Sequence, residues 1–563
     1  MSDELKHECA VAMVVLRKPP SPTGDFGGTK LSLLLEKQHN RGQDGAGAAT
    51  LSSNPVPGEP PYWIAKSASA TSLADVLGAI GKREISSERI FLGHLRYATF
   101  GKNEEKFCHP FVHESSELAH TLFLAGNFNL TNAAELFERY RSLGEFPTSR
   151  ADGYLITELI AHELAKGKSL PTCISSALAN ADGAWTLCGM TGDGWAFATR
   201  DAHGIRPGFC YMDENVVIVA SERPAIQAAF DVPPEAVKEL PPGETMVVSP
   251  DGEVECCQCE YVASTNTQCQ LEIGNIGIGN IGNNDNITPR GCVFERIYFS
   301  RANDADIHRE RRALGAALVP QILKAADSPI ENIFFSYIPN SARIAFHGLL
   351  ERLFVEHGKV RFGEIAVKDA KFRTFIADAA ARREFYKHVY DVTYGLVRPG
   401  SDTLVVLDDS IVRGNTMKNA ILPMLDRLEP KRIVIASSAP PIRYPDCYGI
   451  DMSTLGELVA FKALVNLTGG NDALSSATSA TLPELYGRFT DEEHCREIAR
   501  LLTPPGMKAE VKVVYQTLDA LHTACPDSSG DWYFTGDYPT SGGYKVLDRA
   551  IRNYLERKHE RSY

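Results

Sequence analysis

The sequence has 563 residues, several times the length that one hydrophobic core usually serves, so we expect two or more domains. Apolar residues make up 44% and charged residues 23%, which is typical of a globular protein and excludes a collagenous, largely disordered or coiled-coil chain. The 58 Lys and Arg residues against 71 Asp and Glu give a net charge of -13, which argues against general binding to nucleic acid.

Neither a membrane helix nor an export signal is expected. No run approaches the roughly 20 apolar residues that a membrane-spanning helix needs, and the N-terminal segment 1–8 is too short and polar for a secretory signal. The 13 cysteines are an odd number and are scattered, which favours free thiols in a reducing compartment. We therefore predict a cytoplasmic protein that binds no membrane.

Short strands broken by turns, with a few helices, extend to about residue 255. Apolar runs predict strands at 90–93, 122–125 and 216–220, and apolar residues spaced by three and four predict a helix over 154–164. This mixture is typical of an α+β layered domain. The composition then shifts to Gly and Asn over 256–290, which is typical of a linker or insert.

Strands alternate with helices after residue 290. Nearly continuous apolar runs at 333–338, 403–407 and 432–436 are typical of strands that are buried on both faces. Such strands predict an α/β domain with a mostly parallel sheet covered by helices. We therefore expect one domain over 9–255 and a second over 291–563, which includes a C-terminal extension.

The most specific motif directly follows the strand expected at 403–407. Two adjacent carboxylates, Asp408 and Asp409, precede a short loop that contains Gly414, and a helix is expected from about Met417. At the carboxyl end of a parallel strand, backbone N–H groups and a helix N-terminus suit a phosphate. The carboxylates suit sugar hydroxyls or a hard cation such as Mg²⁺. The alternative is a strand-ending turn and helix cap without a ligand.

This motif resembles the 5-phosphoribosyl-1-pyrophosphate (PRPP) signature of the type I phosphoribosyltransferases. The resemblance implies that the two carboxylates bind the ribose diol and help to hold Mg²⁺, together with Ser341 after the preceding strand. It also implies that the loop binds the 5-phosphate and that a second, mobile loop faces the pyrophosphate. The residues implied in PRPP binding are Asp408, Asp409, Ser410, Ile411, Val412, Arg413, Gly414, Asn415, Thr416, Lys368 and Arg373.

Cys9 stands at the head of an apolar, strand-like run, where a lone cysteine is usually a small buried hydrophobe. Three later segments, 41–47, 93–99 and 125–132, are similar in sequence and order to segments of the N-terminal-nucleophile (Ntn) glutamine amidotransferases, which fold as an αββα sandwich. The resemblance implies that Cys9 is the nucleophile and that its own α-amine is the base. This requires removal of residues 1–8 as a propeptide.

The same resemblance implies the other residues of a glutamine site. The side chain of Asn127 and the backbone N–H of Phe128 would form the oxyanion hole, with Phe128 standing where the family usually has Gly. Arg96 would bind the α-carboxylate of glutamine and Asp152 its α-ammonium, while Asn127 would also contact the substrate.

Several cysteines raise the question of a metal. The run 256–259 with Cys269 has no second Cys-x-x-Cys or His pair, so a structural or incidental role is expected. Some amidotransferases hold a [4Fe–4S] cluster, which usually needs four thiolates. Only Cys292, Cys447 and, shifted in position, Cys525 resemble its ligands, so we expect Mg²⁺ as the cofactor and no iron–sulfur cluster.

The two sets of motifs, in order from Cys9 to Asp451, together resemble the amidophosphoribosyltransferase family. The resemblance implies hydrolysis of glutamine and transfer of its ammonia to C1 of PRPP, which yields 5-phosphoribosylamine, pyrophosphate and glutamate in the first step of de novo purine synthesis. Inhibition by purine nucleotides and a homo-oligomer, expected to be a tetramer, are also implied. Two alternatives stay open: another Ntn amidotransferase, such as a hexosamine-phosphate synthase, and a non-catalytic PRPP or nucleotide sensor.

Overall fold

The computed structural model describes most of the chain. The described residues are 9–18, 25–52, 58, 60–82, 88–98, 104–258, 289–339, 341–368 and 390–558, without the side chains of residues 367, 368 and 390. The expected propeptide 1–8, Arg373 and most of the Gly/Asn-rich segment lie outside these residues.

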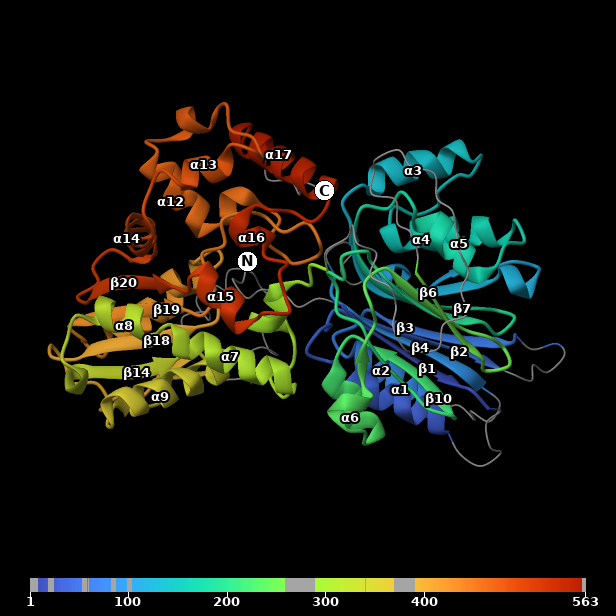
Figure 1. Cartoon of the computed structure of the whole chain (residues 1–563), viewed down its shortest axis with the longest axis horizontal. Coiled ribbons are helices and arrows are strands. Elements are labelled where there is room, and N and C mark those ends of the chain that lie inside the picture. The colour runs from blue at the N-terminus through green and yellow to red at the C-terminus, as the bar shows by residue number, and fades with distance from the viewer. Residues whose placement is uncertain are drawn as a thin grey trace.

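Two antiparallel sheets lie face to face in the first half of the chain (Figure 1). The seven-stranded sheet has the order β11-β9-β10-β1-β4-β2-β3, with β1 (Ala10–Leu16), β2 (Gly45–Ser52), β3 (Tyr62–Ser67), β4 (Glu88–Arg96), β9 (Phe209–Met212), β10 (Val216–Ala220) and β11 (Lys238–Glu239). The six-stranded sheet has the order β13-β12-β8-β7-β6-β5, with β5 (Phe111–His113), β6 (Leu122–Leu130), β7 (Gly183–Thr191), β8 (Ala196–Arg200), β12 (Glu244–Val248) and β13 (Val254–Gln258). The strands expected at 90–93, 122–125 and 216–220 are thus confirmed.

Apolar side chains point alternately to the two faces of the sheet along β1, which explains why other elements cover both faces. Val11, Met13 and Val15 pack between the two sheets, whereas Ala10, Ala12 and Val14 face the helices. The helices on this outer face are α1 (Phe26–Lys37), α2 (Ser72–Gly81) and α6 (Arg223–Phe230). The other sheet carries α3 (Ala133–Ser142), α4 (Asp152–Leu164) and α5 (Leu170–Leu178), with 3₁₀ turns at η1 (Glu105–Phe107) and η2 (Leu118–His120), whereas the turn η3 (Pro234–Ala236) lies beside α6. The predicted αββα sandwich is confirmed.

A parallel sheet forms the centre of the second half. Its order is β15-β14-β18-β19-β20, with β14 (Ile333–Tyr337), β15 (Arg361–Phe362), β18 (Thr403–Asp408), β19 (Arg432–Ser437) and β20 (Glu510–Tyr515). One face packs on α8 (Val319–Ala326) and α9 (Arg343–His357), and the other on α11 (Leu422–Asp426), α12 (Val459–Leu467) and α14 (Asp491–Leu502). Helices on both faces explain the continuous apolar strands, and the predicted α/β fold is confirmed.

The remaining elements surround this sheet. They are the ribbon β16 (Ala366–Lys368) and β17 (Tyr390–Val392), the π-helical turns η4 (Glu295–Phe299) and η7 (Met417–Ile421), the 3₁₀ turns η5 (Ile330–Asn332), η8 (Leu455–Glu457) and η9 (Asn471–Leu474), and the helices α7 (Ala305–Ala317), α13 (Leu482–Tyr486), α15 (Leu518–Ala524), α16 (Trp532–Thr535) and α17 (Ser541–Leu555). Within the described part of the chain, no helix combines the length and apolar character that crossing a membrane requires.

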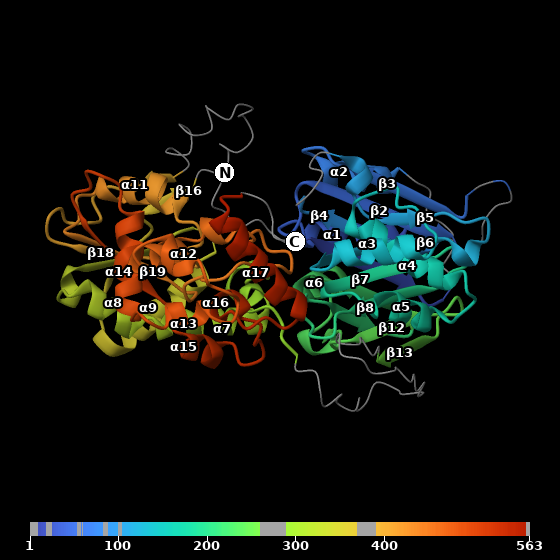
Figure 2. The same cartoon turned by 90° about the horizontal axis from the view of Figure 1, so that it is seen from above.

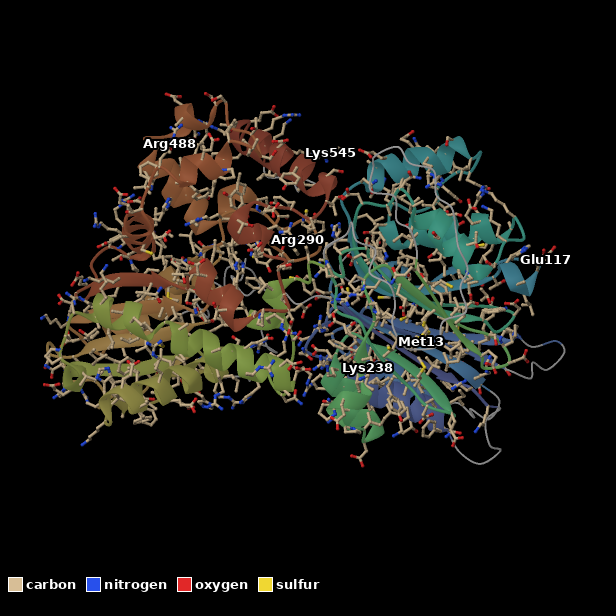
Figure 3. All side chains as sticks on the ribbon, viewed as in Figure 1. Met13, Glu117, Lys238, Arg290, Arg488 and Lys545 are labelled. Atoms are coloured by element: carbon tan, nitrogen blue, oxygen red, sulfur yellow. The ribbon has the colours of Figure 1, made fainter. Side chains whose placement is uncertain are left out.

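The two halves lie side by side and touch along several polar contacts (Figure 2). Arg290 lies at this junction (Figure 3), where its N–H donates to the carbonyl of His203 at 2.7 Å. Asp182, just before β7, accepts hydrogen bonds from the Gly542 N–H (2.9 Å) and the Thr540 hydroxyl (2.6 Å) at the start of α17. These contacts fix the C-terminal helix against the sandwich.

Two glycines allow α7 and α9 to pack closely, and this leads to a prediction. A Cβ added at Gly348 would lie 1.9 Å from the carbonyl oxygen of Arg312, and one at Gly315 would lie 1.7 Å from that of Ala345. We expect Gly348→Ala to lower the free energy of unfolding by about 1–3 kcal/mol, because the helices must separate. The measurement is denaturant-induced unfolding. Gly78→Ala in α2 is the matched control, since nothing lies within 4 Å of its added Cβ, and it should be neutral or stabilising.

Candidate functional sites

Cys9 lies where β1 begins, beside the end of β4. Because Ala10 pairs with Leu95, Cys9 faces the segment that carries Arg96 and Tyr97. The Tyr97 N–H donates a hydrogen bond to the Cys9 sulfur at 3.3 Å. Burial raises the pKa of Cys9 to about 12, although the positive charge of Arg96 acts in the opposite direction. The thiol therefore keeps its proton near neutral pH, and a base must remove it before Cys9 can attack a substrate.

Three charged side chains act on this thiol. The charge of Arg96 lowers the pKa of Cys9, and those of Asp152 and Asp44 raise it. Asp152 is the first residue of α4, and burial raises its pKa to about 6 although backbone hydrogen bonds and Arg96 lower it. The structure thus brings together the predicted residues Cys9, Arg96 and Asp152. A cation and an anion beside one nucleophile suit a zwitterionic amino acid.

Asp44 is an addition that the sequence analysis did not single out. Its carboxylate accepts a hydrogen bond from the Ala98 N–H at 3.2 Å, and its own N–H donates to the Arg96 carbonyl at 3.0 Å. It therefore fixes the backbone on both sides of Tyr97. The signal that could have identified it was its place in the segment 41–47, which already resembled the amidotransferases.

Asn127 and Phe128 lie on β6 in the facing sheet, where they pair with Thr186 and Trp185 of β7. Asn127 is buried, and the Phe128 ring packs against the first turn of α4, since a Cβ added at Gly153 would be 3.1 Å from it. The strand that carries the predicted oxyanion donors thus adjoins the turn that carries Asp152.

The second candidate site lies at the carboxyl edge of the parallel sheet. Because β14 pairs in parallel with β18, the loops after Tyr337 and Asp408 leave the sheet side by side. The Ser341 hydroxyl donates a hydrogen bond to the Asp409 carboxylate, which also accepts one from Ser410 at 3.0 Å. Burial raises the pKa of Asp409, whereas these two hydroxyls and the charge of Arg311 lower it.

The loop after Asp409 presents backbone rather than side chains for much of its length. The side chains of Ile411 and Val412 are buried. Gly414 has a φ of +79°, and a Cβ there would lie 2.3 Å from Leu502, so this turn requires glycine. Thr416 directly precedes the helical turn η7, as expected for a phosphate loop, and Asn415 is exposed beside it.

The guanidinium of Arg413 is bound by neighbouring segments of the protein. Its Nε donates to Glu457 at 2.6 Å, and one terminal nitrogen donates to the Asp451 carbonyl at 2.9 Å. Arg413 therefore contributes its backbone to the loop, while its charge fixes the neighbouring η8 segment. For Lys368 the structure describes the backbone in β16 only, and Arg373 lies outside the described residues.

Similar proteins were then found by sequence and by structure. The amidophosphoribosyltransferase of Methanocaldococcus jannaschii is 29% identical over 438 residues, which cover 76% of this chain and 83% of that protein. The amidophosphoribosyltransferase of Pseudomonas aeruginosa is 28% identical over 448 residues, which cover 76% of this chain and 79% of that protein. No protein-family model matches the sequence. The predicted resemblance to the amidophosphoribosyltransferases is confirmed.

Solved structures agree with this result at the level of the fold. Glutamine PRPP amidotransferase from B. subtilis, complexed with ADP and GMP, superposes with a TM-score of 0.66 at 23% identity and covers 95% of this chain and 98% of that chain. A structure described as the allosteric regulatory enzyme of purine biosynthesis superposes with a TM-score of 0.67 at 24% identity. The match covers 96% of this chain and 99% of that chain. The two halves thus follow the fold of such enzymes from end to end.

The carboxyl edge of the parallel sheet fits Mg²⁺ if a ligand completes the shell. Ser341 and Asp409 are hydrogen-bonded, and Asp408 is the last residue of β18, so oxygen donors, which Mg²⁺ prefers, gather here. No group of three His, Cys, Asp or Glu side chains suited to a metal occurs among the described residues. Diphosphate and water oxygens would therefore have to supply the other positions, as is usual for Mg²⁺.

The cysteines that resemble cluster ligands, Cys292, Cys447 and Cys525, are all buried in one hydrophobic core. The Cys292 sulfur lies 3.5 Å from the hydroxyl of Tyr533, in a core where Trp532 and Phe534 are also buried. Cys525 lies instead beside Glu310 and Arg296, which act on its pKa. These three thiols are one fewer than a cluster usually needs. The absence of an iron–sulfur cluster stays a prediction.

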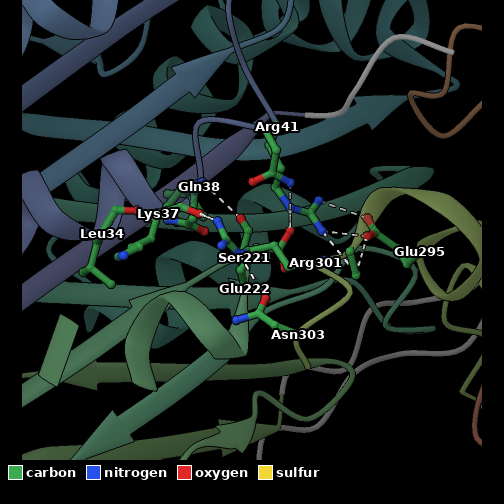
Figure 4. A network of polar contacts seen from close by, with 12 residues as sticks. Leu34, Lys37, Gln38, Arg41, Ser221, Glu222, Glu295, Arg301 and Asn303 are labelled. Carbon is green, nitrogen blue, oxygen red and sulfur yellow. Dashed lines mark hydrogen bonds and ion pairs between the residues drawn. The ribbon is translucent and has the colours of Figure 1, made fainter. Parts of the chain in front are cut away.

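One buried ion-pair network joins the two halves (Figure 4). Arg41, which is fully buried, donates to Glu222 at 2.8 Å and to both oxygens of Glu295 at 3.0 and 2.6 Å. Burial lowers the pKa of Arg41, but the two carboxylates outweigh it and raise the pKa above its ordinary value. Ser300 also donates to Glu295 at 2.7 Å. No motif pointed to this network.

Removing one member of the network should be costly. We expect Glu295→Ala to lower the free energy of unfolding by about 3–5 kcal/mol, because the buried Arg41 loses its bidentate partner. Glu214→Ala is the control, since Glu214 pairs with Lys18 at 3.5 Å on the exposed surface and should change the stability by less than ~1 kcal/mol. Equal unfolding midpoints in denaturant for the two variants would contradict the structural role of Arg41.

Proposed function

We propose that the protein is an amidophosphoribosyltransferase that hydrolyses glutamine at Cys9 and transfers the ammonia to C1 of PRPP. The products are glutamate, pyrophosphate and 5-phosphoribosylamine. The observation that carries the proposal is the presence in one chain of a partly buried thiol flanked by Arg96 and Asp152 and of the Ser341–Asp409 edge of a parallel sheet.

In the first reaction, Arg96 binds the α-carboxylate of glutamine and Asp152 its α-ammonium, which places the side-chain amide at Cys9. The thiol gives its proton to the free α-amine of Cys9, whose reference pKa of about 7.7–8.0 suits a base. The Asn127 side chain and the Phe128 N–H stabilise the oxyanion that forms. The α-ammonium of Cys9 then returns this proton to the departing nitrogen, so ammonia leaves, and water hydrolyses the γ-glutamyl thioester to glutamate and the free thiol. This scheme requires removal of residues 1–8.

In the second reaction, the loop from Ser410 to Thr416 holds the 5-phosphate and the Asp408 and Asp409 carboxylates hold the ribose hydroxyls. Lys368 and Arg373 face the pyrophosphate. Mg²⁺, held by Ser341, Asp408 and Asp409, would neutralise charge that develops on the leaving pyrophosphate. Ammonia forms a bond to C1 as the C1–oxygen bond breaks. Passage through the protein interior keeps ammonia from being protonated to the non-nucleophilic ammonium ion.

Further proposals concern organisation and regulation. We place the amidotransferase domain at residues 9–255, the linker or insert at 256–290 and the phosphoribosyltransferase domain at 291–563. A cytoplasmic location and a homotetramer are proposed from the family resemblance alone. Inhibition by purine nucleotides has further support, because the B. subtilis relative of the same fold was solved with ADP and GMP.

The coupled reaction gives a direct test. Glutamate formed from glutamine and Mg²⁺ should rise when PRPP is added and should match pyrophosphate one for one. Cys9→Ala should abolish the use of glutamine but spare the use of ammonium, because the second site is intact. Cys257→Ala, on β13 away from both sites, is the control and should keep both activities. Glutamate formation unaffected by PRPP would instead favour another Ntn amidotransferase, and an absence of both activities would favour a sensor.

The pKa of Asp152 predicts how glutamine binding depends on pH. Below about pH 6 the Asp152 carboxylate becomes protonated and loses its attraction for the substrate ammonium. In the non-hydrolysing Cys9→Ala variant, the glutamine Kd should therefore rise about tenfold for each pH unit below that value. Calorimetric titration between pH 5 and 8 measures it. The double variant with Asp152→Asn should bind weakly at every pH, and a flat Kd for Cys9→Ala would exclude this role for Asp152.

A further inference from the structure

Two histidines that no motif assigned a role lie stacked between the sheets of the sandwich. The rings of His94 and His109 are nearly parallel, at 7°, with centroids 3.9 Å apart. His94 is on β4, two residues before Arg96, and His109 precedes β5. The exposed fractions are 0% for His94 and 8% for His109, so both residues are buried.

Both rings bind the same peptide segment on the facing sheet. The His94 Nε2 lies 3.1 Å from the Gly126 carbonyl oxygen, and the Gly126 N–H donates to His109 Nδ1 at 3.3 Å. Gly126 directly precedes Asn127 on β6. The histidine stack therefore fixes both backbone groups of the residue next to the proposed oxyanion donors.

The hydrogen bonds define the protonation of each ring. A carbonyl oxygen only accepts, so His94 carries its proton on Nε2, whereas His109 accepts at Nδ1 and carries its proton on Nε2. Two stacked imidazolium ions would repel each other. Burial lowers the pKa of His94 to about 3 and that of His109 well below its ordinary value, and nearby Arg96 lowers both further.

The backbone of β2 approaches His109 closely, because a glycine stands at the point of contact. A Cβ added at Gly47 on β2 would lie 1.9 Å from the His109 carbonyl oxygen, so His109 rests directly on the seven-stranded sheet. Its ring also lies 5.5 Å, centroid to centroid, from Phe128. His109 thus contacts the sheet that carries Arg96, the residue before Asn127 and the side chain of Phe128.

We propose that His94 and His109 are positioning residues that hold the Gly126–Phe128 segment, and hence the oxyanion donors, at a fixed distance from Cys9 across the two sheets. This inference rests on the proposed function. Neither histidine reacts with the substrate. Their contribution is made when the oxyanion forms, so their loss lowers kcat for glutamine more than it changes the KM.

The test compares two replacements of His109. Asn places its side-chain oxygen where Nδ1 stood and still accepts from the Gly126 N–H, whereas Phe keeps a stacked ring without an acceptor. We expect His109→Phe to lower the glutamine-dependent kcat about 10- to 100-fold, with the KM within about twofold. His109→Asn should retain most of the rate. Ammonium-dependent pyrophosphate release should be unchanged in both variants, which also shows that they fold.

Equal glutamine-dependent rates in the two variants, or a parallel loss of the ammonium-dependent rate, would overturn the role proposed for the histidines but not the proposed function. A wild-type protein that releases no pyrophosphate from PRPP with either nitrogen source would overturn the proposed function and this inference together. Where His109→Phe does not fold, His94→Gln and His94→Leu provide the same comparison. Gln offers a side-chain N–H to the Gly126 carbonyl and should retain the rate, whereas Leu offers none and should lose it.

Discussion

The buried guanidinium of Arg41 is the contact on which the relative placement of the two proposed sites depends. It pairs with Glu222 from its own half of the chain and bidentately with Glu295 from the other half. No water reaches a fully buried charge to replace a lost partner, so separating the halves here would leave ions without compensation. The contact also has a fixed direction, because a guanidinium and a carboxylate meet edge to edge in one plane. The ion pair therefore constrains the orientation of the two halves as well as the distance between them.

Charged groups continue from this contact toward each site. The segment that begins at Arg41 ends at Asp44, which acts on the Cys9 thiol and fixes the backbone beside it. On the other side, Arg311 donates to the carbonyl of Ser300, in the segment that binds Arg41, and its charge acts on Asp409. Residues of both proposed sites are thus connected through short chains of contacts to the same buried ion pair.

The fold could be predicted from the sequence because its signals are local, whereas the site residues were predicted from their resemblance to a known family and stay predictions. Apolar runs ending in Asp408 and Asp409 mark a buried strand and its loop, and parallel pairing brings Ser341 to the same edge. The Arg41–Glu295 pair could not be foreseen, since its members are 254 residues apart and look like ordinary surface charges. The structural role of the Arg413 side chain could not be predicted for a similar reason. Only tertiary contacts show that its guanidinium binds other residues of the protein.

The electrostatics around Cys9 limit which group can act as its base. Burial keeps the thiol protonated, with a pKa of about 12. The stacked histidines offer no alternative, because a His94 pKa of about 3 makes its free Nδ1 a weak proton acceptor and His109 Nδ1 already accepts from Gly126. Asp152 is more basic, but its charge is needed for the substrate ammonium. The α-amine of Cys9 is then the group that combines proximity with suitable basicity. A chain that kept residues 1–8 would hold that nitrogen in an amide, which has no proton affinity to offer. Because the thiol keeps its proton, release of the N-terminal segment is a chemical requirement of the proposed reaction.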